Sequence, residues 1–578
     1  MMGAPRDDQA CRNLRWSVAL LDGLVAGGMR HLVLSPGSRS TPVVLAGQRQ
    51  PALQLTPILD ERSAAFFALG LARATRQPVG LLCTSGSAPA HWFPAVIEAA
   101  EWGLPLILLT ADRPPELRAW GANQTVDQIH LFGRFVREFH DPGPPRDEAR
   151  AMKTMTALGA RAASVSRGRR AGPVHINLPF PEPLVPDTDC DPPASGDLRP
   201  LPHARPGAPA PTDDPWSVAP AAIDFHQLSG PGLICCGPGE YTDDDIAALW
   251  SCATNLGLPV LVDPLSGLRF GPAPEVRVTR YDSFLRNPLA AAALRPAWVV
   301  RLGRPPVSRV LNEWLTGVPS LLVDPAERWC DPTHDAVQQI TATPAVFLGW
   351  LQRTDRVTAA PGWLDDWLAA DQRLTALAEQ HLAESPWCEP HLIQTLIARL
   401  PAGDALFCAN SLPIRQLDTW SGARARALAI HGNRGVSGID GQVSTLAGLT
   451  RGGLATWGLL GDLAFCHDLS GLLLAHTLDR PCLVLNNGGG RIFDYLPQRH
   501  VPGVETLWRT PLSLDLGELV RPFGVPHRIV TDGATLDRAL DQVIDRGGAR
   551  VIEIRIDATS SQRVHEGFWQ RVARQDII

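Results

Sequence analysis

The stretch ATWGLLGDLAFCHDLSGLLLAHTLDRPCLVLNNGGG, residues 455–490, holds two apolar runs that end in small or turn-forming residues. The first run, at 455–462, ends in Gly-Asp, and the second, at 481–490, ends in two asparagines followed by three glycines. Continuous rather than alternating hydrophobicity is typical of strands that are buried on both faces, as in a parallel sheet covered by helices. The stretch therefore predicts two strands of a parallel sheet.

Eight more apolar runs of this kind occur along the chain. They are followed by small or turn residues and then by helix-like stretches such as SAAFFALGLARA, residues 63–74. The alternation of runs and helical stretches predicts repeated βαβ units and an α/β fold with doubly wound parallel sheets. The eight runs lie at 31–38, 79–87, 104–114, 172–179, 232–239, 259–264, 297–303 and 320–325.

The length of 578 residues suggests three or four domains at ~150 residues each. Twelve prolines lie between Pro179 and Pro215, and such a segment is typical of an extended connector between domains. A second break is expected around 355–385, where TDRVTAAPG precedes a helix-like segment. We therefore predict three α/β domains, at 1–190, 191–360 and 361–578.

The charge balance narrows the classes of function. The chain has 53 Lys and Arg against 59 Asp and Glu, a net charge of −6, which argues against a general binder of nucleic acids or acidic membranes. Only one of the cations is a lysine, Lys153, so a Walker A loop is excluded. Arginine must therefore supply any positive charge that a ligand needs, and its planar guanidinium suits carboxylates.

The chain shows no pattern for membrane insertion or secretion. No stretch approaches the ~18 to 20 apolar residues that cross a bilayer, and the N-terminal residues lack an apolar signal segment. The eleven cysteines are scattered without CxxC spacing, so we expect reduced thiols rather than a metal site or disulfides. These features predict a soluble, cytoplasmic, multidomain protein.

Two polar residues follow the strands predicted in 455–490. Asp462 and Asn487 end the two apolar runs, so both would project from strand ends into one crevice. Carboxylate, amide and carbonyl oxygens suit Mg²⁺ shared with a diphosphate, and the glycines at 488–490 would let the main chain approach that ligand. The alternative is two ordinary turns, because Gly-Asp and Asn-Gly are common turn pairs.

A second cluster lies in ILDERSAAFFALGLA, residues 58–72, where Glu61 opens a strongly apolar helix. A carboxylate at this position can be a partner of the helix dipole or a cap. It can also be a functional carboxylate in an apolar setting. The residues themselves leave both interpretations open.

A third group carries arginines and amides after predicted strands. It comprises SPGSRSTP (35–42), TADRPPELRAWGANQTVDQ (110–128), ANSLPIRQLD (409–418) and HGNRGVSGIDGQVSTLAG (431–448). Several guanidinium groups at strand ends fit a substrate with more than one carboxylate, because each can form a bidentate charged pair. Taken singly, each arginine can equally be a surface or interdomain salt bridge, and SPGSRS can be a plain helix start.

The segment from Gly461 to Asn487 resembles the diphosphate–metal signature of thiamine diphosphate (ThDP) enzymes, which runs from Gly-Asp-Gly to Asn-Asn. Leu463 departs from the third position, and the span of 27 residues is slightly short of the usual pattern. The Asp and the Asn are both retained. ThDP enzymes also place one glutamate, in an apolar setting, against the pyrimidine ring of the cofactor, and Glu61 matches that role.

Seven segments together resemble one ThDP-dependent family, the 2-succinyl-5-enolpyruvyl-6-hydroxy-3-cyclohexene-1-carboxylate synthases of menaquinone and phylloquinone biosynthesis. The resemblance covers about residues 15–195 and 385–500. It is carried, in the expected order, by PGSRSTP, the DER helix start, TSGSA, LLTADRPPEL, GANQ, NSLPIR and NRGVSGIDG. LLTADRPPEL with the following GANQ is much more specific than the metal signature, which all ThDP enzymes share.

The resemblance implies a transferase. It would decarboxylate 2-oxoglutarate and add the resulting carbanion to isochorismate in a 1,4 sense. The three domains would be a pyrimidine-binding domain, a central domain and a diphosphate-binding domain. The active site would lie at a subunit interface in a homodimer or homotetramer, because in this family the two cofactor-binding domains of one site come from different subunits.

The resemblance also implies roles for single residues. Glu61 would activate the cofactor, and Gln124 would orient the intermediate through its amide. Mg²⁺ (or Mn²⁺) would be held by Asp462, Asn487 and the carbonyl of Gly489. The cofactor would contact Glu61, Ser411, Ile439, Gly461, Asp462, Leu463, Asn487 and Gly489. The substrates would contact Ser38, Arg39, Asn123, Gln124, Arg309, Ser411, Arg415, Arg434, Ile492 and Phe493.

Two alternatives remain from the sequence. Another ThDP decarboxylase or carboligase, such as the acetolactate synthase group, would share the Glu and the Asp and Asn but would not explain the arginines of SPGSRSTP and NSLPIR. Some members of that group bind FAD in the middle domain, and CCGPGEYTDDDI (235–246) has a glycine turn but lacks the full GxGxxG. The other alternative is a binding relative that has lost its chemistry; retention of Glu61 and Asp462 argues against it.

Overall fold

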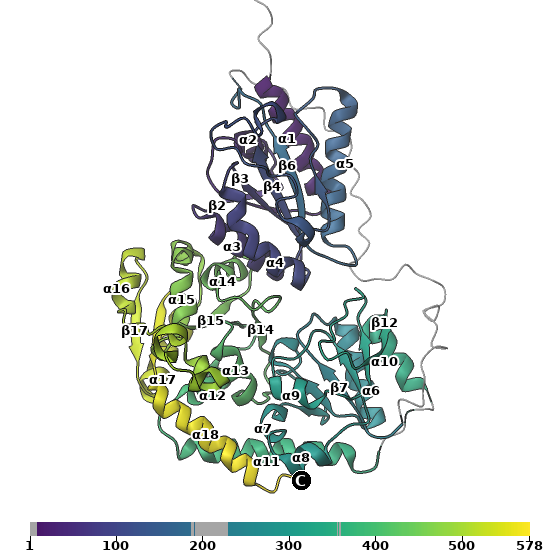
Figure 1. Cartoon of the computed structure of the whole chain (residues 1–578), viewed down its shortest axis with the longest axis vertical. Helices are drawn as coiled ribbons and strands as arrows, with labels where there is room; N and C mark the ends of the chain where they lie inside the picture. Colours follow the sequence, from purple (N-terminus) through teal and green to yellow (C-terminus); the bar gives the residue numbers. More distant parts are fainter. Residues whose placement is uncertain (1–8, 187–189, 191–228, 355–356, 358–359) are drawn as a thin grey trace, which may run out of the picture. The chain divides into compact units, whose positions relative to one another are not determined.

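A computed structural model describes residues 9–186, 190, 229–354, 357 and 360–578. It contains three six-stranded sheets in which the paired strands run parallel, with helices between the strands (Figure 1). The predicted α/β class with three parallel sheets is confirmed. We call the three sheets with their helices the N-terminal, central and C-terminal domains.

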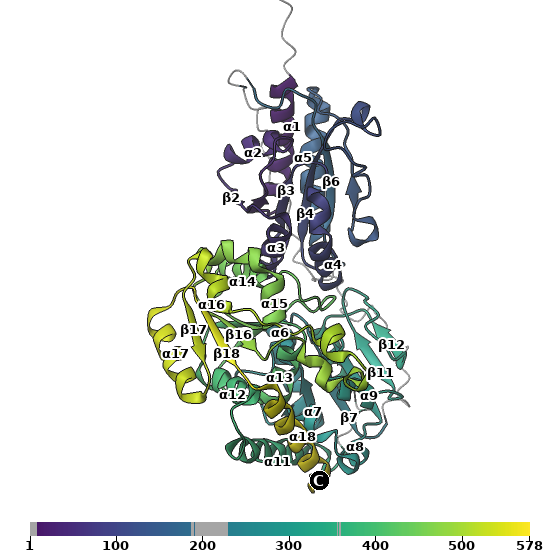
Figure 2. The same cartoon turned by 60° about the vertical axis from the view of Figure 1, so that its left-hand side comes forward.

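The N-terminal sheet has the strand order β2-β1-β3-β4-β6-β5. Its strands are β1 (His31–Leu34), β2 (Gln54–Pro57), β3 (Val79–Cys83), β4 (Leu106–Asp112), β5 (Phe139–His140) and β6 (Val174–Pro179). Its helices are α1 (Gln9–Ala26), α2 (Thr41–Gln48), α3 (Glu61–Thr75), α4 (Phe93–Trp102) and α5 (Ala149–Ser166). Figures 1 and 2 show α1 and α5 side by side against this sheet. The single lysine, Lys153, is exposed on α5.

The central sheet has the order β12-β11-β10-β7-β8-β9, the arrangement of dinucleotide-binding sheets. Its strands are β7 (Gly232–Cys236), β8 (Val260–Val262), β9 (Arg277–Val278), β10 (Trp298–Leu302), β11 (Ser320–Val323) and β12 (Ala336–Ile340). Its helices are α6 (Asp243–Leu256), α7 (Tyr281–Phe284), α8 (Pro288–Ala293), α9 (Arg309–Trp314) and α10 (Pro344–Arg353).

The C-terminal sheet, β14-β13-β15-β16-β18-β17, repeats the order of the N-terminal sheet. Its strands are β13 (Ala405–Cys408), β14 (Ala429–His431), β15 (Thr456–Gly461), β16 (Cys482–Asn486), β17 (His527–Val530) and β18 (Val551–Arg555). Its helices are α11 (Trp363–Ala383), α12 (Glu389–Arg399), α13 (Leu412–Trp420), α14 (Gln442–Arg451), α15 (Asp462–His467), α16 (Leu516–Val520), α17 (Gly533–Arg546) and α18 (Ala558–Arg574).

All ten apolar runs of the sequence contain a strand, and most of these strands are buried along their whole length. Every residue of β3, β4, β6 and β7 is buried, as expected for strands covered by helices on both faces. The side chains of these strands form continuous apolar cores with the flanking helices. The hydrophobic runs therefore define the centre of each sheet.

The chain forms two compact units. One contains Met1–Ala208 together with Asn433–Leu454 and Cys466–Leu478, and the other contains the rest. Helix α14 therefore belongs to the same unit as α3, and glycines bring these two helices into contact. A Cβ at Gly70 would lie 2.1 Å from the carbonyl oxygen of Thr445, and a Cβ at Gly448 would lie 2.0 Å from that of Phe67. Only glycine permits this approach of the two backbones.

The expectation that all cysteines are reduced is wrong for one pair. Cys11 in α1 and Cys190 form a disulfide, with Cα atoms 5.5 Å apart, within the usual range for this bond. The two residues are 179 positions apart, so no local spacing pattern could indicate the pairing. The other nine cysteines form no disulfide in the described ranges. The proline-rich connector lies mostly in 191–228, outside the described residues.

The helices within the described ranges include none that is both long enough and apolar enough to cross a membrane.

Candidate functional site

Several of the predicted site residues follow strands at the points where the strand order reverses. In doubly wound sheets ligands bind at the carboxyl ends of strands, beside such a reversal. In the N-terminal sheet the reversal lies between β1, which precedes Ser38 and Arg39, and β3, which precedes the turn at Ser85. In the C-terminal sheet it lies between β13, which precedes Ser411, and β15, which precedes Asp462. The residues at the N-terminal sheet lie in one compact unit and those at the C-terminal sheet lie in the other.

Glu61 is the first residue of α3 and is half-buried. The cap of the helix is its neighbour Asp60, whose carboxylate accepts from the N–H groups of Arg62 and Ser63. The carboxylate of Glu61 adds to the effect of burial in raising the pKa of the Cys83 thiol at the end of β3. Because Asp60 serves as the cap, the simple capping interpretation of Glu61 is wrong.

Arg39 is buried behind the turn that follows β1. Its Nη1 donates to the carbonyl oxygen of Phe180 at 2.8 Å, and its Nη2 pairs with Glu182 Oε1 at 2.8 Å, while its Nε has no hydrogen-bond partner in the described ranges. The neighbouring Ser38 is exposed, and Ser40 precedes α2 without a side-chain cap bond. The interpretation of SPGSRS as a serine-capped helix start is therefore not supported by the geometry.

Gln124 lies on an exposed loop that is fastened to the turn after β3. It has a φ of 55°, its Nε2 donates to the carbonyl oxygen of Ser85 at 3.1 Å, and its own carbonyl accepts from Arg113 Nη1 at 2.8 Å. Burial, and then the nearby charge of Arg39, lower the pKa of Arg113. Arg113 thus stands beside Arg39 and Gln124, although sequence reasoning did not select it. Asn123 is exposed on the same loop.

Gln128, fully buried, holds this loop in place. Its Oε1 accepts from the N–H of Gly86 at 3.1 Å, and its Nε2 donates to the carbonyl oxygen of Ala111 at 3.2 Å and to Asn177 Oδ1 at 3.0 Å. One side chain therefore links the turn after β3, strand β4 and strand β6. The sequence placed Gln128 in the GANQTVDQ segment but offered no signal for its partners.

The loop that carries Arg434 and Ile439 lies in the compact unit of the N-terminal sheet. The buried carboxylate of Glu98 in α4 accepts from the N–H groups of Gly435 at 2.7 Å and Val436 at 2.8 Å. Arg434 and Ile439 are both half-buried. Glu98 and Gly435 are 337 residues apart, so the sequence offered no signal for this contact.

Asp462 starts α15 directly after β15 and is buried. Its Oδ2 accepts from the N–H groups of Gly488 at 3.0 Å and Gly489 at 2.8 Å, and its Oδ1 accepts from that of Leu463 at 2.7 Å. Burial raises the pKa of Asp462 to about 6, against the opposing effect of these N–H groups. The predicted meeting of the Gly461–Asp462 turn with the Asn-Asn-Gly turn is thereby observed.

Asn487 is oriented by a carboxylate that sequence reasoning did not select. Its Nδ2 donates to Oε1 of the buried Glu389 at 3.1 Å, and Oε2 of Glu389 accepts from Ser561 Oγ. The amide nitrogen is thus engaged, so the carbonyl oxygen Oδ1 is the atom of Asn487 left to meet a ligand.

These residues suit a hard divalent ion. Within the ranges that the structure describes, no group of three or more His, Cys, Asp and Glu side chains could hold a metal ion. A metal here must therefore draw on amide and carbonyl oxygens as well as a carboxylate, which is the donor set of Asp462, Asn487 and Gly489. Oxygen donors of this kind favour Mg²⁺, and Mn²⁺ accepts the same set.

Ser411 and Arg415 lie at the start of α13. Ser411 has φ 70° and ψ −126°, and its carbonyl oxygen accepts from Arg415 Nη1 at 2.5 Å. Ile492 and Phe493 lie in a short 3-10 helix, Arg491–Tyr495, and are half-buried. Arg309 starts α9 with a side chain that is 72% exposed and paired with Glu313 at 2.6 Å.

At the reversal point of the central sheet, between β7 and β10, two turns of the chain lie in close contact. A Cβ at Gly237 would lie 1.6 Å from the carbonyl oxygen of Arg304, and the hydroxyl of Tyr241 donates to the carbonyl oxygen of Gly237 at 3.1 Å. The glycine turn of CCGPGEYTDDDI therefore packs directly against the turn after β10.

The sequence of the chain is similar to family models and to known proteins over most of its length. Residues 15–131 match the model described as "Thiamine pyrophosphate enzyme, N-terminal TPP binding domain", and residues 224–408 match the "Middle domain of thiamine pyrophosphate". Three relatives bear the name 2-succinyl-5-enolpyruvyl-6-hydroxy-3-cyclohexene-1-carboxylate synthase. The protein of Geobacillus kaustophilus is 39% identical over 97% of this chain and 98% of its own. The protein of Chloroflexus aurantiacus is 38% identical over 96% of this chain and 96% of its own. The protein of Dechloromonas aromatica is 40% identical over 94% of this chain and 98% of its own.

Proposed function

Because the chain belongs to the 2-succinyl-5-enolpyruvyl-6-hydroxy-3-cyclohexene-1-carboxylate synthase family of ThDP-dependent transferases, we propose that it uses 2-oxoglutarate and isochorismate as substrates. The first substrate loses CO₂, and the remaining four-carbon carbanion adds to isochorismate in a 1,4 sense. The product is the cyclohexene carboxylate of the family name, on the route to menaquinone or phylloquinone. ThDP, when bound, stabilises the carbanion that decarboxylation leaves.

The observation that carries the proposal is the contact between the turn at Asp462 and the turn at Gly488 and Gly489. It forms a site of oxygen donors at the reversal point of the C-terminal sheet, where a diphosphate with its metal ion would bind. Asp462, Asn487 and the carbonyl of Gly489 would hold Mg²⁺. The ion would neutralise the diphosphate charge and fix the cofactor in place.

The N-terminal unit supplies the groups for proton handling and orientation. Glu61 would accept a hydrogen bond from the pyrimidine ring, and Ile439 would support the cofactor from an apolar side. The Gln124 amide, held by Ser85 and Arg113, would orient the reacting carboxylate group. A side chain with both donor and acceptor atoms suits this task.

Recognition of the substrates rests on arginine. The cationic pair Arg39 and Arg113 at the N-terminal sheet would bind carboxylates, as would Arg415 in the C-terminal domain and Arg434. Ser38, Asn123, Ser411 and Arg309 would add polar contacts, and Ile492 with Phe493 would form an apolar wall. The presence of one lysine in the chain explains why every proposed cation is an arginine.

We propose that a complete site needs two copies of the chain, one contributing Glu61 and the other Asp462. The active species would then be a homodimer or a homotetramer. Light scattering on the active protein measures this directly, and a monomer with full activity would contradict it.

The substrate proposal is tested by the release of CO₂ from 2-oxoglutarate. We expect release coupled to product formation only when ThDP, Mg²⁺ and isochorismate are all present. Release that proceeds equally well from pyruvate without isochorismate would instead indicate an enzyme of the acetolactate synthase type. No release under any condition would indicate a catalytically silent relative.

The role of Glu61 is tested by Glu61→Gln. We expect this variant to bind ThDP with nearly normal affinity, measured by calorimetry, while kcat falls at least ~100-fold, because a neutral amide cannot replace the carboxylate in acid–base catalysis. Glu101→Gln, on the exposed side of α4, serves as the control and should retain activity. Normal turnover by Glu61→Gln would exclude this role.

A further inference from the structure

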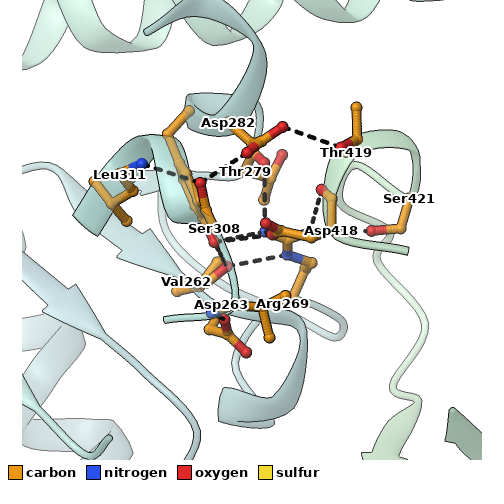
Figure 3. Close-up of polar contacts among 12 residues, drawn as sticks. Val262, Asp263, Arg269, Thr279, Asp282, Ser308, Leu311, Asp418, Thr419 and Ser421 are labelled. Atoms are coloured by element: carbon orange, nitrogen blue, oxygen red, sulfur yellow. Dashed lines mark hydrogen bonds and ion pairs between the residues drawn. The ribbon is translucent and has the colours of Figure 1, made fainter. Parts of the chain in front are cut away.

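A buried polar cluster connects the central domain to the C-terminal end of α13 (Figure 3). Arg269, which follows the short helix Pro264–Ser266, is fully buried. Its Nη1 donates to the carbonyl oxygen of Asp418 at 2.8 Å, and its Nη2 donates to Asp418 Oδ1 at 2.8 Å. Its Nε donates to the carbonyl oxygen of Val262 at 3.0 Å, which fixes the guanidinium to β8.

A second arginine of the central domain binds the next residue of the same helix. Arg280 Nη1 donates to the carbonyl oxygen of Thr419 at 3.1 Å. The last carbonyl groups of a helix have no partner within the helix, so an external donor is needed when they are buried. Here Arg269 and Arg280 supply these donors, and both are cations at the negative end of the helix dipole.

Asp282, in α7, joins α13 to α9. Its Oδ2 accepts from Thr419 Oγ1 at 3.0 Å, and its Oδ1 accepts from Ser308 Oγ at 2.7 Å. Ser308 is the cap of α9, since its Oγ also accepts from the N–H of Leu311 at 3.1 Å. One carboxylate thus contacts the last turn of α13 and the first turn of α9, and Figure 3 shows it between the two hydroxyl groups.

We propose that Asp282 and Arg269 are positioning residues that set where α13 presents Ser411 and Arg415, and where α9 presents Arg309. This inference rests on the proposed function, in which these three side chains bind the anionic substrates. Asp282 and Arg269 touch neither substrate nor cofactor themselves. They act through the placement of two helices that belong to different domains.

Two features of α13 favour this role. The helix has nine residues, about 13 Å of rise, so fixing its last turn also fixes its first turn. At its start, Ser411 adopts a φ of 70°, a conformation that a residue with a side chain keeps only when the surroundings enforce it. The bonds at Asp418 and Thr419 hold the helix from the opposite end.

The variant Thr419→Val removes one hydroxyl of the cluster and keeps the shape of the side chain. We expect it to raise the KM of at least one substrate roughly fivefold, the equivalent of one net buried hydrogen bond, with kcat within about twofold. Thr419→Ser keeps the hydroxyl and should restore the normal KM. In an Arg415→Ala background Thr419→Val should add a smaller increase, because one of the three residues that the cluster positions is gone.

A purely structural role would give a different result. Thr419→Val would then lower the melting temperature without changing either KM, or would raise KM equally with and without Arg415. Either outcome would overturn the proposal.

Hydrogen exchange tests the inference without relying on the reaction. In Thr419→Val, amides at 411–416 and 309–312 should exchange roughly fivefold faster than in Thr419→Ser. Faster exchange confined to the residues next to Thr419 would contradict the coupling. If the wild-type protein fails to join 2-oxoglutarate to isochorismate, the proposed function is wrong, and the exchange data still decide whether the cluster places the two helices.

Discussion

At the scale of a single residue, the contact with Glu389 orients the side-chain amide of Asn487, so that its Oδ1 atom would face the proposed metal ion. An amide has a donor and an acceptor of nearly equal size, so its orientation depends on its partners. The carboxylate of Glu389 can only accept, and it engages the Nδ2 atom. Groups that orient metal ligands in this way commonly affect metal affinity even though they do not contact the ion.

We expect Glu389→Ala to lower the affinity for Mn²⁺, measured by electron paramagnetic resonance in the presence of ThDP, by about 10- to 100-fold. Glu389→Gln is the matched control, because its amide oxygen can still accept from Asn487 and the loss should be smaller. Equal affinity in wild type and Glu389→Ala would show that the orientation of Asn487 does not depend on this contact.

The buried His175 predicts a dependence of stability on pH. Thr110 Oγ1 donates to Asn177 Oδ1, so it accepts from His175 Nε2 at 2.8 Å, and the Nδ1 of His175 has no partner in the described part of the chain. Burial lowers the pKa of His175 to about 3, from 6.5 in a solvated histidine. The folded state therefore binds fewer protons than the unfolded state between these values, and its stability falls as the pH falls.

Below pH 6.5, we expect the free energy of unfolding of the wild type to fall more steeply with falling pH than that of His175→Gln. The difference between the two slopes should reach up to about 1.4 kcal/mol per pH unit. Glutamine keeps a donor for Thr110 but does not titrate. Urea unfolding of both proteins at pH 7.5 and pH 5.5 measures the difference. Parallel pH profiles would show that His175 does not control this slope.

Residue patterns predicted the parts of the site that depend on local sequence. Asp462, Asn487 and Glu61 stand next to strand ends or helix starts, so their positions could be predicted from the chain itself. The supporting residues Glu389, Gln128 and Glu98 could not be predicted. Each works through contacts with segments 17 to 338 residues away, and no local pattern indicates such partners.

At the scale of elements, the direct contact between α3 and α14 connects Glu61, the first residue of α3, to the segment after Ile439. The contact depends on Gly70 and Gly448, because a side chain at either position would meet the backbone of the facing helix. Packing of this kind allows little adjustment, since protein interiors are dense.

Gly70→Ala should therefore destabilise the protein by about 1–3 kcal/mol, because the added methyl group must push the two helices apart. Gly349→Ala is the control, since that glycine lies within α10 and a Cβ there would find Arg353 Nη1 as its nearest neighbour at 3.8 Å. Alanine is the better helix former, so the control should be neutral or slightly stabilising. Thermal unfolding compares the two, and a stable Gly70→Ala would argue against close contact.

Some strands could be predicted from the sequence and others could not. The ten long apolar runs each contain a strand, whereas eight further strands in the described part of the chain escaped the pattern. Several of these are edge strands with exposed positions, such as β2 and β17, in which hydrophobicity is not continuous. Strand β18 is buried but carries Glu553, whose charge interrupts the apolar run and pairs with His527 and Arg555.

At the scale of the whole molecule, the Cys11–Cys190 disulfide closes a loop of 179 residues in the N-terminal unit. A cross-link over such a distance restricts the unfolded chain, and a simple chain-entropy model assigns it about 5 kcal/mol. This bond connects α1 to the end of the segment that we predicted as the first domain.

Cys11→Ser should lower the melting temperature under oxidising conditions to the value that the wild type shows in reductant. Reductant should leave Cys11→Ser itself unchanged, because its remaining cysteines form no disulfide with one another in the described ranges. A thiol count on the unfolded, unreduced wild type should give nine rather than eleven. A count of eleven would mean that the two thiols remain reduced in solution.

The exposed position of Lys153 on α5 has a practical consequence. No other side chain in the sequence carries a primary amine, so once the α-amino group is blocked, reagents that target primary amines will tether the protein through one point only. Molecules attached to a sensor chip through this group would all face the same way, and binding curves for cofactor and substrates would report a single, uniform population.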